Sequence, residues 1–515
     1  MIPRATWTAA ALLSAASLSA ADLVKVTGGT LEGTVGADPS VRVFRGVPFA
    51  APPVGPLRWK APQPVAAWAG TRKADTWGTR CMQGTMFGMP LVSREAGMGE
   101  DCLYLNVWTS ARAAGEKRPV LVVFHGGGYA AGSASEPRTD GEWFARQGIV
   151  VVAPNYRLGV FGFMAHPELS AESGGKGSGN YGMLDQARAL EWVRDNVAAF
   201  GGDPGRITIN GESAGSLSVS ALMVSPLTKN LVHQAIGQSG AFFPSPTRGM
   251  FEKALAEKEK DGSAFTASVG AASLADLRAK PAADVLAAAM AQNGGWGYSP
   301  GVDGHFLPER ASALYATGRQ AKIPLLAGWT SSEIGMAVAM NPQKPTVASF
   351  TEEAKKTFGE KAPEAARAYG ATADDQAPQA AAALASDLFI AYSTWKWIEV
   401  QAATAPVFRY RFDRALPAAN GMNRFGAMHA SDIEYAFHTL DSRADPWTPD
   451  DRSAEATFSA ALANFVKTGT PVGPGVPEWP DYGKTHRVMT IDAKSAHAPE
   501  QDRARYELID AVAPR

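Results

Sequence analysis

Residues 206–223 read RITINGESAGSLSVSALM, and they place a serine between two glycines where one periodic pattern gives way to another. The β-branched RITIN run predicts a buried strand, and the small-residue run from Ala214 predicts a helix. Gly211 and Gly215 suit a strained turn in which strand and helix approach too closely for side chains. Ser213 on such a turn is a candidate nucleophile. The alternative is an ordinary turn of small residues.

A glycine triplet earlier in the chain matches what such a nucleophile needs. Residues 120–128 read VLVVFHGGG, so the triplet follows a run that is typical of a buried parallel strand. A serine hydroxyl requires a base, a group that orients the base, and donors for the oxyanion. Glycine N–H groups can supply these donors because no Cβ obstructs them. His125 is interpreted as a residue that orients this loop rather than as the base.

Strand-like and helix-like segments alternate between residues 105 and 240. Short β-branched runs at 120–127, 148–156 and 206–210 predict buried strands, and apolar residues spaced by three and four predict a helix over 181–202. This alternation predicts an α/β fold, with a large, mostly parallel sheet flanked by helices on both faces.

The remaining segments are assigned to the same domain. Residues 26–35 and 41–50 predict antiparallel strands at one edge of the sheet. Ala-rich helical stretches at roughly 245–320 and 345–405 predict insertions that form a lid. Because no repeat or low-complexity linker divides the chain, we expect one domain over 22–515.

The composition is that of a globular protein with a large core. Of 515 residues, 45% are hydrophobic and 19% charged, and the formal net charge is −1. Residues of both signs are interspersed along the chain. We therefore expect no nucleic-acid partner and no attraction to anionic membranes.

The N-terminal stretch predicts export. Arg4 precedes an apolar, Ala/Leu-rich run, and Ser19 and Ala21 are small residues at the −3 and −1 positions of a cut before Asp22. Residues 1–21 are interpreted as a cleavable signal peptide, the alternative being an N-terminus that is retained. The run is too short to span a membrane, and no later apolar run is long enough. We expect a secreted or periplasmic protein without a membrane anchor.

The sequence contains two cysteines, Cys81 and Cys102. In an exported protein, an even pair at short separation predicts one disulfide that closes a surface loop. Two unpaired, buried thiols are the alternative. No metal site is expected, because no histidines accompany the pair at ligand spacing.

A series of motifs along nearly the whole chain resembles the type-B carboxylesterase/cholinesterase family of α/β-hydrolases, in particular bacterial para-nitrobenzyl-esterase-like carboxylesterases. The matching stretches are VFRGVPFAAPPVGPLRW (43–59), GEDCLYLNVW (99–108), VFHGGGYAAGS (123–133), NYRLGVFGF (155–163), GNYGMLDQARALEWVRDNVAAFGGDPGRITINGESAG (179–215), GQSGA (237–241), VDGHFLP (302–308), LLAGWTSSEIG (325–335) and GAMHASDIEYAF (426–437). They occur in the order that the family has.

The resemblance implies an α/β-hydrolase fold with helical lid insertions. It also implies that the backbone N–H groups of Gly127, Gly128 and Ala214 are the oxyanion donors. Finally, it implies that Cys81 and Cys102 form a disulfide.

The base is expected late in the chain, because α/β-hydrolases carry their triad in the order serine, acid, histidine. His429 lies in a small-residue loop after the strand-like run 405–413, where the family carries its base. His438 lies on an apolar-flanked segment and is interpreted as a structural histidine.

Glu333 is the expected orienting acid. It follows the strand-like run 323–329, and its task is to stabilise the imidazolium without taking the proton. The family commonly has an acidic residue before this glutamate and a glycine after it, whereas Ser332 and Ile334 stand here. Three competing carboxylates are interpreted as turn, helix-packing and supporting residues, respectively: Asp303, Asp387 and Asp432.

Glu212, Ser239 and Asp432 match family positions of a buried polar network that would hold His429. The implied reaction is ester hydrolysis. Ser213 attacks the carbonyl while the histidine takes its proton, the alcohol leaves, and water releases the acid from the acyl-enzyme. The reaction requires no metal and no cofactor.

The substrate pocket is expected to be apolar. Cholinesterases of the family carry an aromatic residue, usually Trp, in the loop between the cysteines. Here that loop contains Phe87 and several methionines but no Trp, which disfavours choline esters. Tyr129, Trp296 and Tyr298 are candidate pocket residues, and ordinary packing is the alternative for the latter two. We expect small to medium uncharged aryl or alkyl esters as small-molecule substrates.

Three other functions are compatible with these motifs. A lipase would act at lipid interfaces, and a specialised esterase would act on hydroxycinnamate or polyester substrates. A non-catalytic adhesion or scaffold member would be expected to lack the serine or the histidine, and both are present. No pattern in the sequence indicates an oligomeric state.

Overall fold

The structure is a computed structural model that describes residues 23–85, 92–246, 253–334, 344–417 and 426–514. The stretch interpreted as a signal peptide and Phe87 lie outside these residues. Within the described part of the chain, no helix is both long and apolar enough to cross a membrane.

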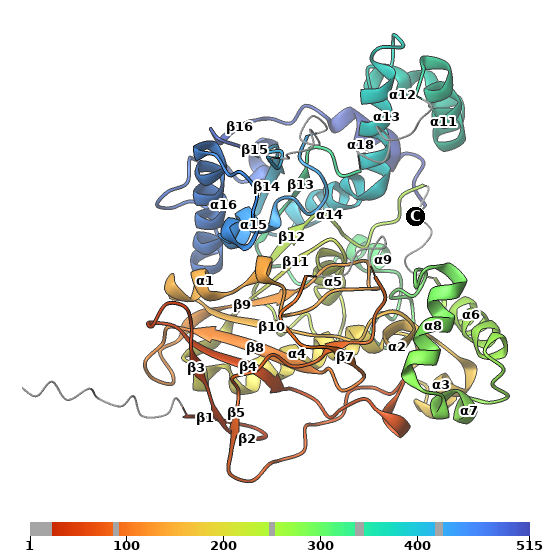
Figure 1. The fold of residues 1–515 in the computed structure, drawn as a ribbon. Coiled ribbons are helices and arrows are strands. Elements are labelled where there is room, and N and C mark those ends of the chain that lie inside the picture. The colour runs from red at the N-terminus through yellow and green to blue at the C-terminus, as the bar shows by residue number, and fades with distance from the viewer. Residues whose placement is uncertain (1–22, 86–91, 247–252, 335–343, 418–425, 515) are drawn as a thin grey trace, which may run out of the picture.

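An eleven-stranded sheet forms the centre of the molecule (Figure 1). Neighbouring strands run parallel from β10 to β15, and antiparallel strands complete both edges. The predicted α/β fold with a mostly parallel sheet is thus confirmed. In spatial order the strands are β16 (Ala496–Pro499), β15 (Arg487–Ile491), β14 (Val407–Phe412), β13 (Leu325–Thr330), β12 (Gln234–Gln238), β11 (Gly202–Glu212), β9 (Arg118–Phe124), β10 (Val150–Pro154), β8 (Tyr104–Thr109), β4 (Arg42–Pro48) and β3 (Thr34–Val35).

The N-terminal strands divide between sheets. The expected strand over 26–35 is split, because β2 (Gly29–Glu32) pairs with β1 (Leu23–Val26) and β5 (Thr71–Lys73) in a small sheet, while β3 alone joins β4. The split falls at Gly33, where a Cβ atom would lie 2.6 Å from the ring of Phe44. A third, two-stranded sheet contains β6 (Arg80–Cys81) and β7 (Met98–Gly99).

Helices cover both faces of the large sheet. Side chains alternate along each strand, so successive residues of one strand enter different cores. On β9, Val120 and Val122 join the core shared with α4 (Tyr181–Asn196) and α5 (Ala214–Leu222). Leu121 and Val123 point the other way, into the core shared with α15 (Ile433–Phe437) and α16 (Pro449–Thr468). The short helices and 3-10 turns are η1 (Gly55–Leu57), η2 (Pro137–Thr139), α1 (Glu142–Arg146), α2 (Gly159–Phe163), α3 (Pro167–Glu172), η3 (Val197–Phe200), η7 (Leu440–Ser442), α17 (Tyr482–Thr485) and α18 (Arg503–Asp510).

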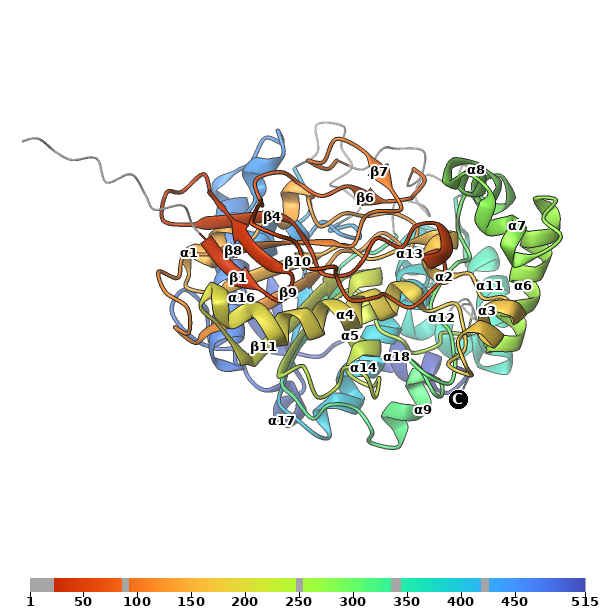
Figure 2. The ribbon, with the colours of Figure 1, turned by 90° about the horizontal axis from the view of Figure 1, so that it is seen from below.

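The two Ala-rich stretches form separate helical groups. Figures 1 and 2 show α6, α7 and α8 together on one side of the sheet, and α11, α12 and α13 together at another place. Within the second Ala-rich stretch, the regular α-helical pattern is interrupted by a π turn, η5 (Asp387–Ala391). The bounds are α6 (Leu255–Ser268), α7 (Leu274–Ala279), α8 (Ala282–Asn293), α9 (Ala311–Ala316), α11 (Val347–Phe358), η4 (Gly359–Lys361), α12 (Ala362–Ala368), α13 (Ala377–Ser386) and α14 (Tyr392–Ala402).

The strand register brings several loops to one edge of the sheet. Strands β9, β11, β12 and β13 are parallel neighbours, with Phe124 opposite Gly211 and Glu212 opposite Gln238. Segments that follow such strands meet at their carboxyl ends, where α/β sheets bind ligands. The glycine loop and Ser213 follow two of these strands.

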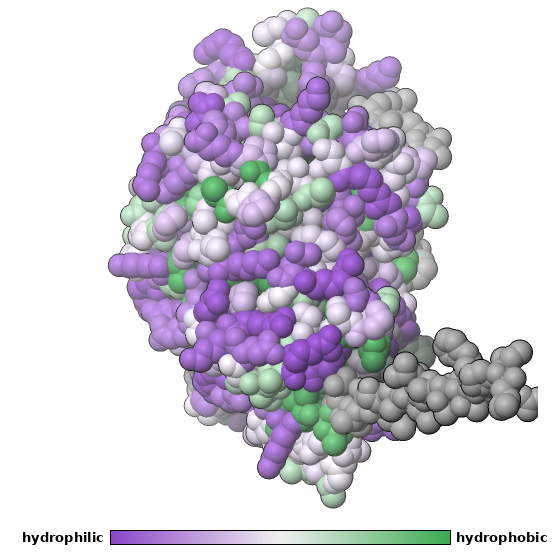
Figure 3. All heavy atoms as spheres, turned by 90° about the vertical axis from the view of Figure 1, so that its left-hand side faces the viewer, coloured by the Kyte–Doolittle hydropathy of each residue, from purple (hydrophilic) through white to green (hydrophobic). Residues whose placement is uncertain are grey.

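The face of the molecule in Figure 3 is mostly hydrophilic, with apolar patches that are small and scattered.

Candidate active site

Ser213 lies on a strained turn between β11 and α5. Its φ of 56° and ψ of −121° lie in a region that non-glycine residues rarely adopt. A Cβ atom on Gly211 would lie 2.2 Å from the carbonyl carbon of Gly215, and one on Gly215 would lie 2.1 Å from the carbonyl oxygen of Phe124. Both glycines are therefore required by close backbone approach. The turn presents Ser213 at the end of the sheet.

His429 lies between Ser213 and Glu333. Its Nε2 atom is 2.8 Å from the Oγ atom of Ser213, and its Nδ1 atom is 2.5 Å from Oε2 of Glu333. The backbone N–H of His429 also donates to the carbonyl oxygen of Glu333, at 3.1 Å. The imidazole can therefore take a proton from the serine while the glutamate fixes its orientation.

Glu333 is held by two further donors and is 2% exposed. Its Oε1 atom accepts hydrogen bonds from Ser239 Oγ at 2.7 Å and from the backbone N–H of Thr330 at 2.9 Å. Both oxygens of the carboxylate are thus hydrogen-bonded, Oε2 to the histidine and Oε1 to Ser239 and Thr330. Ser239, predicted from the GQSGA motif, follows β12 and joins the site through this bond.

The competing carboxylates have other partners. Asp303 accepts from the backbone N–H groups of His305 and Leu307, as expected for a turn residue. Asp387 accepts from the hydroxyl of Tyr369 and forms an ion pair with Arg505 at 3.0 Å. Their interactions match the turn and helix-packing roles given to them from sequence.

A group of buried carboxylates surrounds the imidazole. Oε1 of Glu212 lies 3.3 Å from Nε2 of His429, and burial raises the pKa of Glu212 to about 7. Burial also raises the pKa of Asp432 to about 6; this residue accepts from Gln238 and Tyr410 and lies behind the histidine loop. Burial disfavours the imidazolium of His429, but the nearby carboxylates outweigh this effect and raise its pKa above the usual range of a histidine.

The glycine loop and the start of α5 adjoin the serine. Gly127 and Gly128 have φ values of 103° and 63°, and both line the same cavity as Ser213 and Ala214. A Cβ atom on Gly128 would lie 2.4 Å from the ring of Trp296. Backbone N–H groups here and at the helix N-terminus can stabilise a developing oxyanion.

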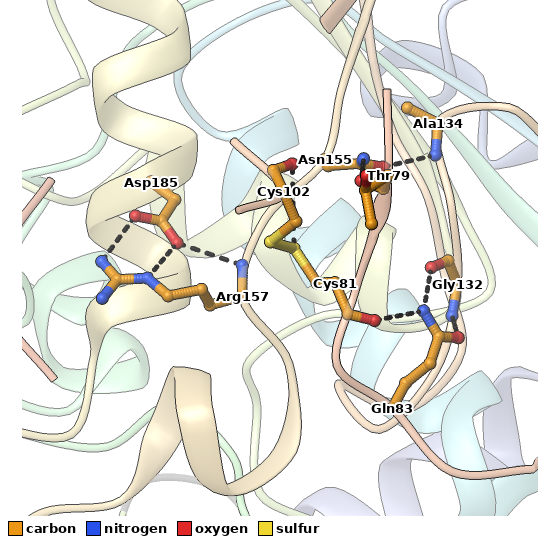
Figure 4. The surroundings of a disulfide bond; sticks show 9 residues. All are labelled: Thr79, Cys81, Gln83, Cys102, Gly132, Ala134, Asn155, Arg157 and Asp185. Carbon is orange, nitrogen blue, oxygen red and sulfur yellow. Dashed lines mark hydrogen bonds and ion pairs between the residues drawn. A yellow bond between two sulfur atoms is a disulfide. The ribbon is translucent and has the colours of Figure 1, made fainter. Parts of the chain in front are cut away.

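Cys81 and Cys102 form a disulfide, with their Cα atoms 4.9 Å apart. Figure 4 shows how the segment after Cys81 reaches the glycine loop. The side-chain amide of Gln83 donates to the carbonyl oxygen of Gly132 and accepts from its N–H, each at 2.9 Å. The disulfide loop therefore braces the far end of the glycine loop.

The serine opens into an apolar cavity of about 500 Å³. This volume is that of a small-molecule site. Ser213, His429, Glu212 and Arg138 contribute polar groups to its wall. The larger apolar residues on the wall are Leu217, Phe242, Phe243, Trp296, Tyr298, Phe389 and Ile390.

Of the predicted pocket residues within the described chain, two line the cavity and one does not. Trp296 and Tyr298 line the cavity, as expected. Tyr129 does not, and this expectation is corrected: its side chain is fully buried, packs on Phe163, and accepts a hydrogen bond from Ser218 Oγ at 3.2 Å. Tyr129 points into the core because the glycine loop turns its own backbone, not the tyrosine, toward the serine.

Two histidines have the structural roles predicted for them. Nδ1 of His125 lies 2.9 Å from the carbonyl oxygen of Gly126, and its ring stacks on Tyr156. Nδ1 of His438 lies 3.2 Å from Ser459 Oγ, and its ring stacks on Trp143. Neither ring lines the cavity in the described structure.

Sequence reasoning missed several residues of the cavity wall. Phe242 and Phe243 directly follow the GQSGA motif, which could have indicated them. Phe389 lies on the π turn η5, and its ring contacts His429 edge-on with centroids 5.2 Å apart. Arg138 lies on η2, downstream of the glycine loop, where no motif marks it.

One group among the described residues has the spacing of metal ligands: Glu399, His486 and Glu500. Arg503 donates to both carboxylate oxygens of Glu399, and Arg409 pairs with Glu500. Because arginines already balance these carboxylates, the group is explained as an ion-pair network.

The fold and the site together define an α/β-hydrolase. More particularly, the chain belongs to the Carboxylesterase family, whose model matches residues 20–508, and it is a carboxylic ester hydrolase.

Named relatives and solved structures of similar proteins are also esterases. The chain is 35% identical to fumonisin B1 esterase of Sphingopyxis macrogoltabida over 90% of this chain and 85% of that protein. It is 32% identical to para-nitrobenzyl esterase of Bacillus subtilis over 90% of this chain and 94% of that protein. A crystal structure of a Geobacillus stearothermophilus carboxylesterase matches with a TM-score of 0.82 and 32% identity, over 94% of this chain and all of that chain (100%). A structure of a PNB esterase matches with a TM-score of 0.80 and 30% identity, over 95% and 99%.

Proposed function

We propose that this enzyme hydrolyses carboxylic esters through an acyl-enzyme formed on Ser213. The observation that carries the proposal is the unbroken series of contacts from Ser213 through His429 to the buried Glu333, at the wall of an apolar cavity. Separate segments of the chain supply these three groups, so their alignment is a property of the fold.

In the first step, His429 takes the proton of Ser213 as its oxygen attacks the ester carbonyl. The N–H groups of Gly127, Gly128 and Ala214 stabilise the oxyanion. The intermediate then collapses, and His429 gives its proton to the departing alcohol. Glu333 stays ionised throughout and stabilises the imidazolium.

In the second step, His429 takes a proton from water, which attacks the acyl-enzyme. Collapse of this intermediate returns the proton to Ser213 and releases the acid. Glu212 and Asp432 support the histidine electrostatically and take no part in bond making. Ser239 holds Glu333 in place through its hydroxyl.

The cavity favours small to medium aryl or alkyl esters. Its wall is built from aromatic and aliphatic side chains, among them Phe242, Trp296 and Phe389. A cavity of about 500 Å³ accommodates one such ester.

Kinetics of single variants test this function. We expect kcat/KM for a 4-nitrophenyl ester to fall by about 10³-fold or more in Ser213→Ala and His429→Gln, and strongly in Glu333→Gln. The control is Asp387→Asn, because Asp387 is a buried carboxylate with its own ion pair. Rates are expressed per amount of folded protein. A comparable loss in Asp387→Asn but not in Glu333→Gln would show that Glu333 is not the orienting acid. Full turnover by Ser213→Ala would contradict the nucleophile.

We also propose that the protein is exported and that residues 1–21 are removed. The small residues before Asp22 support this proposal. Expression of the full chain in a bacterial host should place the activity outside the cytoplasm, with a mature N-terminus at Asp22. A mature protein that retains Met1 would contradict it.

A further inference from the structure

Arg138 is the one lysine or arginine among the described residues that line the cavity around Ser213. It lies on η2, which follows the glycine loop in the chain. Its side chain is 26% exposed, whereas that of its partner Glu136 is only 3% exposed. Arg138 thus places a guanidinium in the same cavity as Ser213, His429 and Glu212, and the proposed ester chemistry does not use it.

The guanidinium is anchored from one side only. Its Nε atom donates to Oε2 of Glu136 at 2.7 Å, and Oε1 of Glu136 accepts from the backbone N–H of Ser133 at 3.0 Å. Within the described chain, no group accepts a hydrogen bond from either Nη atom of Arg138, and neither atom is among the buried unpaired ones. The two outer nitrogens of the fork therefore reach accessible space.

The neighbouring carboxylates keep this group charged and have other contacts of their own. Burial lowers the pKa of Arg138, but Glu136, Glu434 and Glu212 outweigh this effect and raise the pKa above its usual value. Glu434 also pairs with Arg443 at 3.3 Å, and Glu212 faces His429. No oxygen of these last two lies within hydrogen-bond distance of Arg138 in the described structure.

We propose that Arg138 determines specificity by binding an anionic group, a carboxylate, on the acyl or alcohol arm of the ester. This inference rests on the proposed function of Ser213, because the carboxylate must be bound while the ester carbonyl reaches that serine. A guanidinium presents parallel donors that match the two oxygens of a carboxylate, and such charge-assisted bonds are strong. Apolar walls strengthen the contact further because water does not screen it well.

The inference narrows the substrate class. Sequence alone favoured uncharged esters, and no motif in the sequence marks Arg138. Neutral esters remain substrates under this proposal, and esters with a second, free carboxylate are preferred over them. A diester of a dicarboxylic acid in which one ester group has been hydrolysed, which is a half-ester, carries such a carboxylate.

Matched ester pairs test the proposal. Monoethyl adipate is compared with its neutral amide analogue, ethyl adipamate, to probe the acyl arm. The acetate ester of 4-hydroxybutanoate is compared with that of 4-hydroxybutanamide to probe the alcohol arm. Shorter and longer homologues of each pair scan the reach to Arg138. We expect kcat/KM to favour the carboxylate member by about 10-fold or more in one of the two series.

Variants at Arg138 then assign the preference. We expect the carboxylate-to-amide ratio to fall toward one in Arg138→Gln and to be partly kept in Arg138→Lys. Ethyl 6-aminohexanoate, which carries a cation instead, should gain relative to ethyl adipamate in Arg138→Gln. Arg443→Gln is the matched control, because Arg443 pairs with Glu434 but does not line the cavity.

Equal rates for the acid and amide members of both series in the unmodified enzyme would overturn the proposal. A uniform loss of all rates in Arg138→Gln, with unchanged ratios, would also overturn it and leave Arg138 as a counter-ion of Glu136. The proposed nucleophile is tested separately by Ser213→Ala. If turnover survives that change, the mechanism fails, while the acid-to-amide ratio still reports on Arg138.

Discussion

His429 faces one carboxylate at each ring nitrogen, Glu333 at Nδ1 and Glu212 at Nε2. Both stabilise the imidazolium and so raise the pKa of His429. In the proposed mechanism His429 must be neutral to act as the base, so we expect activity to rise with pH as His429 loses its proton. Removing one carboxylate lowers the pKa, which makes the neutral base available at lower pH.

Glu212→Gln should therefore shift the acid limb of the kcat/KM profile to lower pH. The measurement is a profile with a neutral ester, beside that of Glu168→Gln, which alters an exposed carboxylate outside the cavity. An acid limb that stays in place, or moves to higher pH, would mean that Glu212 does not act on His429.

The glycine loop offers a second test at the scale of one residue. In Gly128→Ala the new methyl group would meet the ring of Trp296, and the alanine would have to adopt a φ of 63°. We expect kcat to fall by about 10²–10³-fold, with a smaller change in KM, because the proposed oxyanion donor is displaced. Gly318→Ala, at a φ of 68° with open space around it, is the control for backbone strain alone. Equal losses in both variants would contradict a role for Gly128 in the reaction.

At this scale the sequence predicted what short motifs encode. Ser213, Glu333 and His429 each lie in a local pattern that follows a strand in the chain, and the structure brings these three together. Phe389 and Arg138 reach the same cavity from segments without a motif. Their roles depend on how distant elements pack, which spacing along the chain does not reveal.

Among the elements, α16 illustrates how a helix end stabilises the fold. Thr448 and Asp451 form a reciprocal capping box at its start, and Arg414 donates to Asp451 at 2.6 Å. Burial raises the pKa of Asp451, but hydrogen bonds from Arg414 and Thr448 outweigh this effect and lower it to about 2.

Asp451→Asn should lower the free energy of unfolding in a pH-dependent way. Because the folded-state pKa lies below that of an unfolded aspartate near 4, the stabilisation is present above about pH 4 and is lost as the pH falls toward 2. Urea denaturation at several pH values measures it. A difference between variant and parent that does not shrink in acid would contradict the account.

The regular elements were predicted more fully than the irregular ones. Strands β9, β10 and β11 and helix α4 have strong periodic patterns, and the structure contains each of them. The π turn η5 was not predicted, because one extra residue in a helix leaves its overall spacing nearly unchanged. The split between β2 and β3 was also missed, since it depends on a side chain from another strand.

For the whole molecule, the disulfide connects stability with the site. Cys81 and Cys102 are 21 residues apart, and the chain-entropy account gives about 3 kcal/mol for such a closed loop. Replacing both by serine should lower the free energy of unfolding by about this amount, as measured by denaturant titration. It should also reduce kcat, because Gln83 links this loop to Gly132. Reduction of the unmodified protein should reproduce both effects; an unchanged kcat would separate the disulfide from the glycine loop.

The overall architecture followed from sequence because it repeats one rule. Parallel strands alternate with helices, and each loop that bears chemistry follows a strand at the same edge. The helical groups α6–α9 and α11–α14 were located by composition alone. What they present to the cavity, such as Phe389, required the three-dimensional arrangement.

Covalent trapping tests the central claim most directly. A fluorophosphonate ester is incubated with the intact protein, and the product is examined by intact-mass and peptide mass spectrometry. We predict one adduct per chain, located on Ser213, absent in Ser213→Ala and formed much more slowly in His429→Gln. An adduct on another residue, or labelling that persists in Ser213→Ala, would contradict the account.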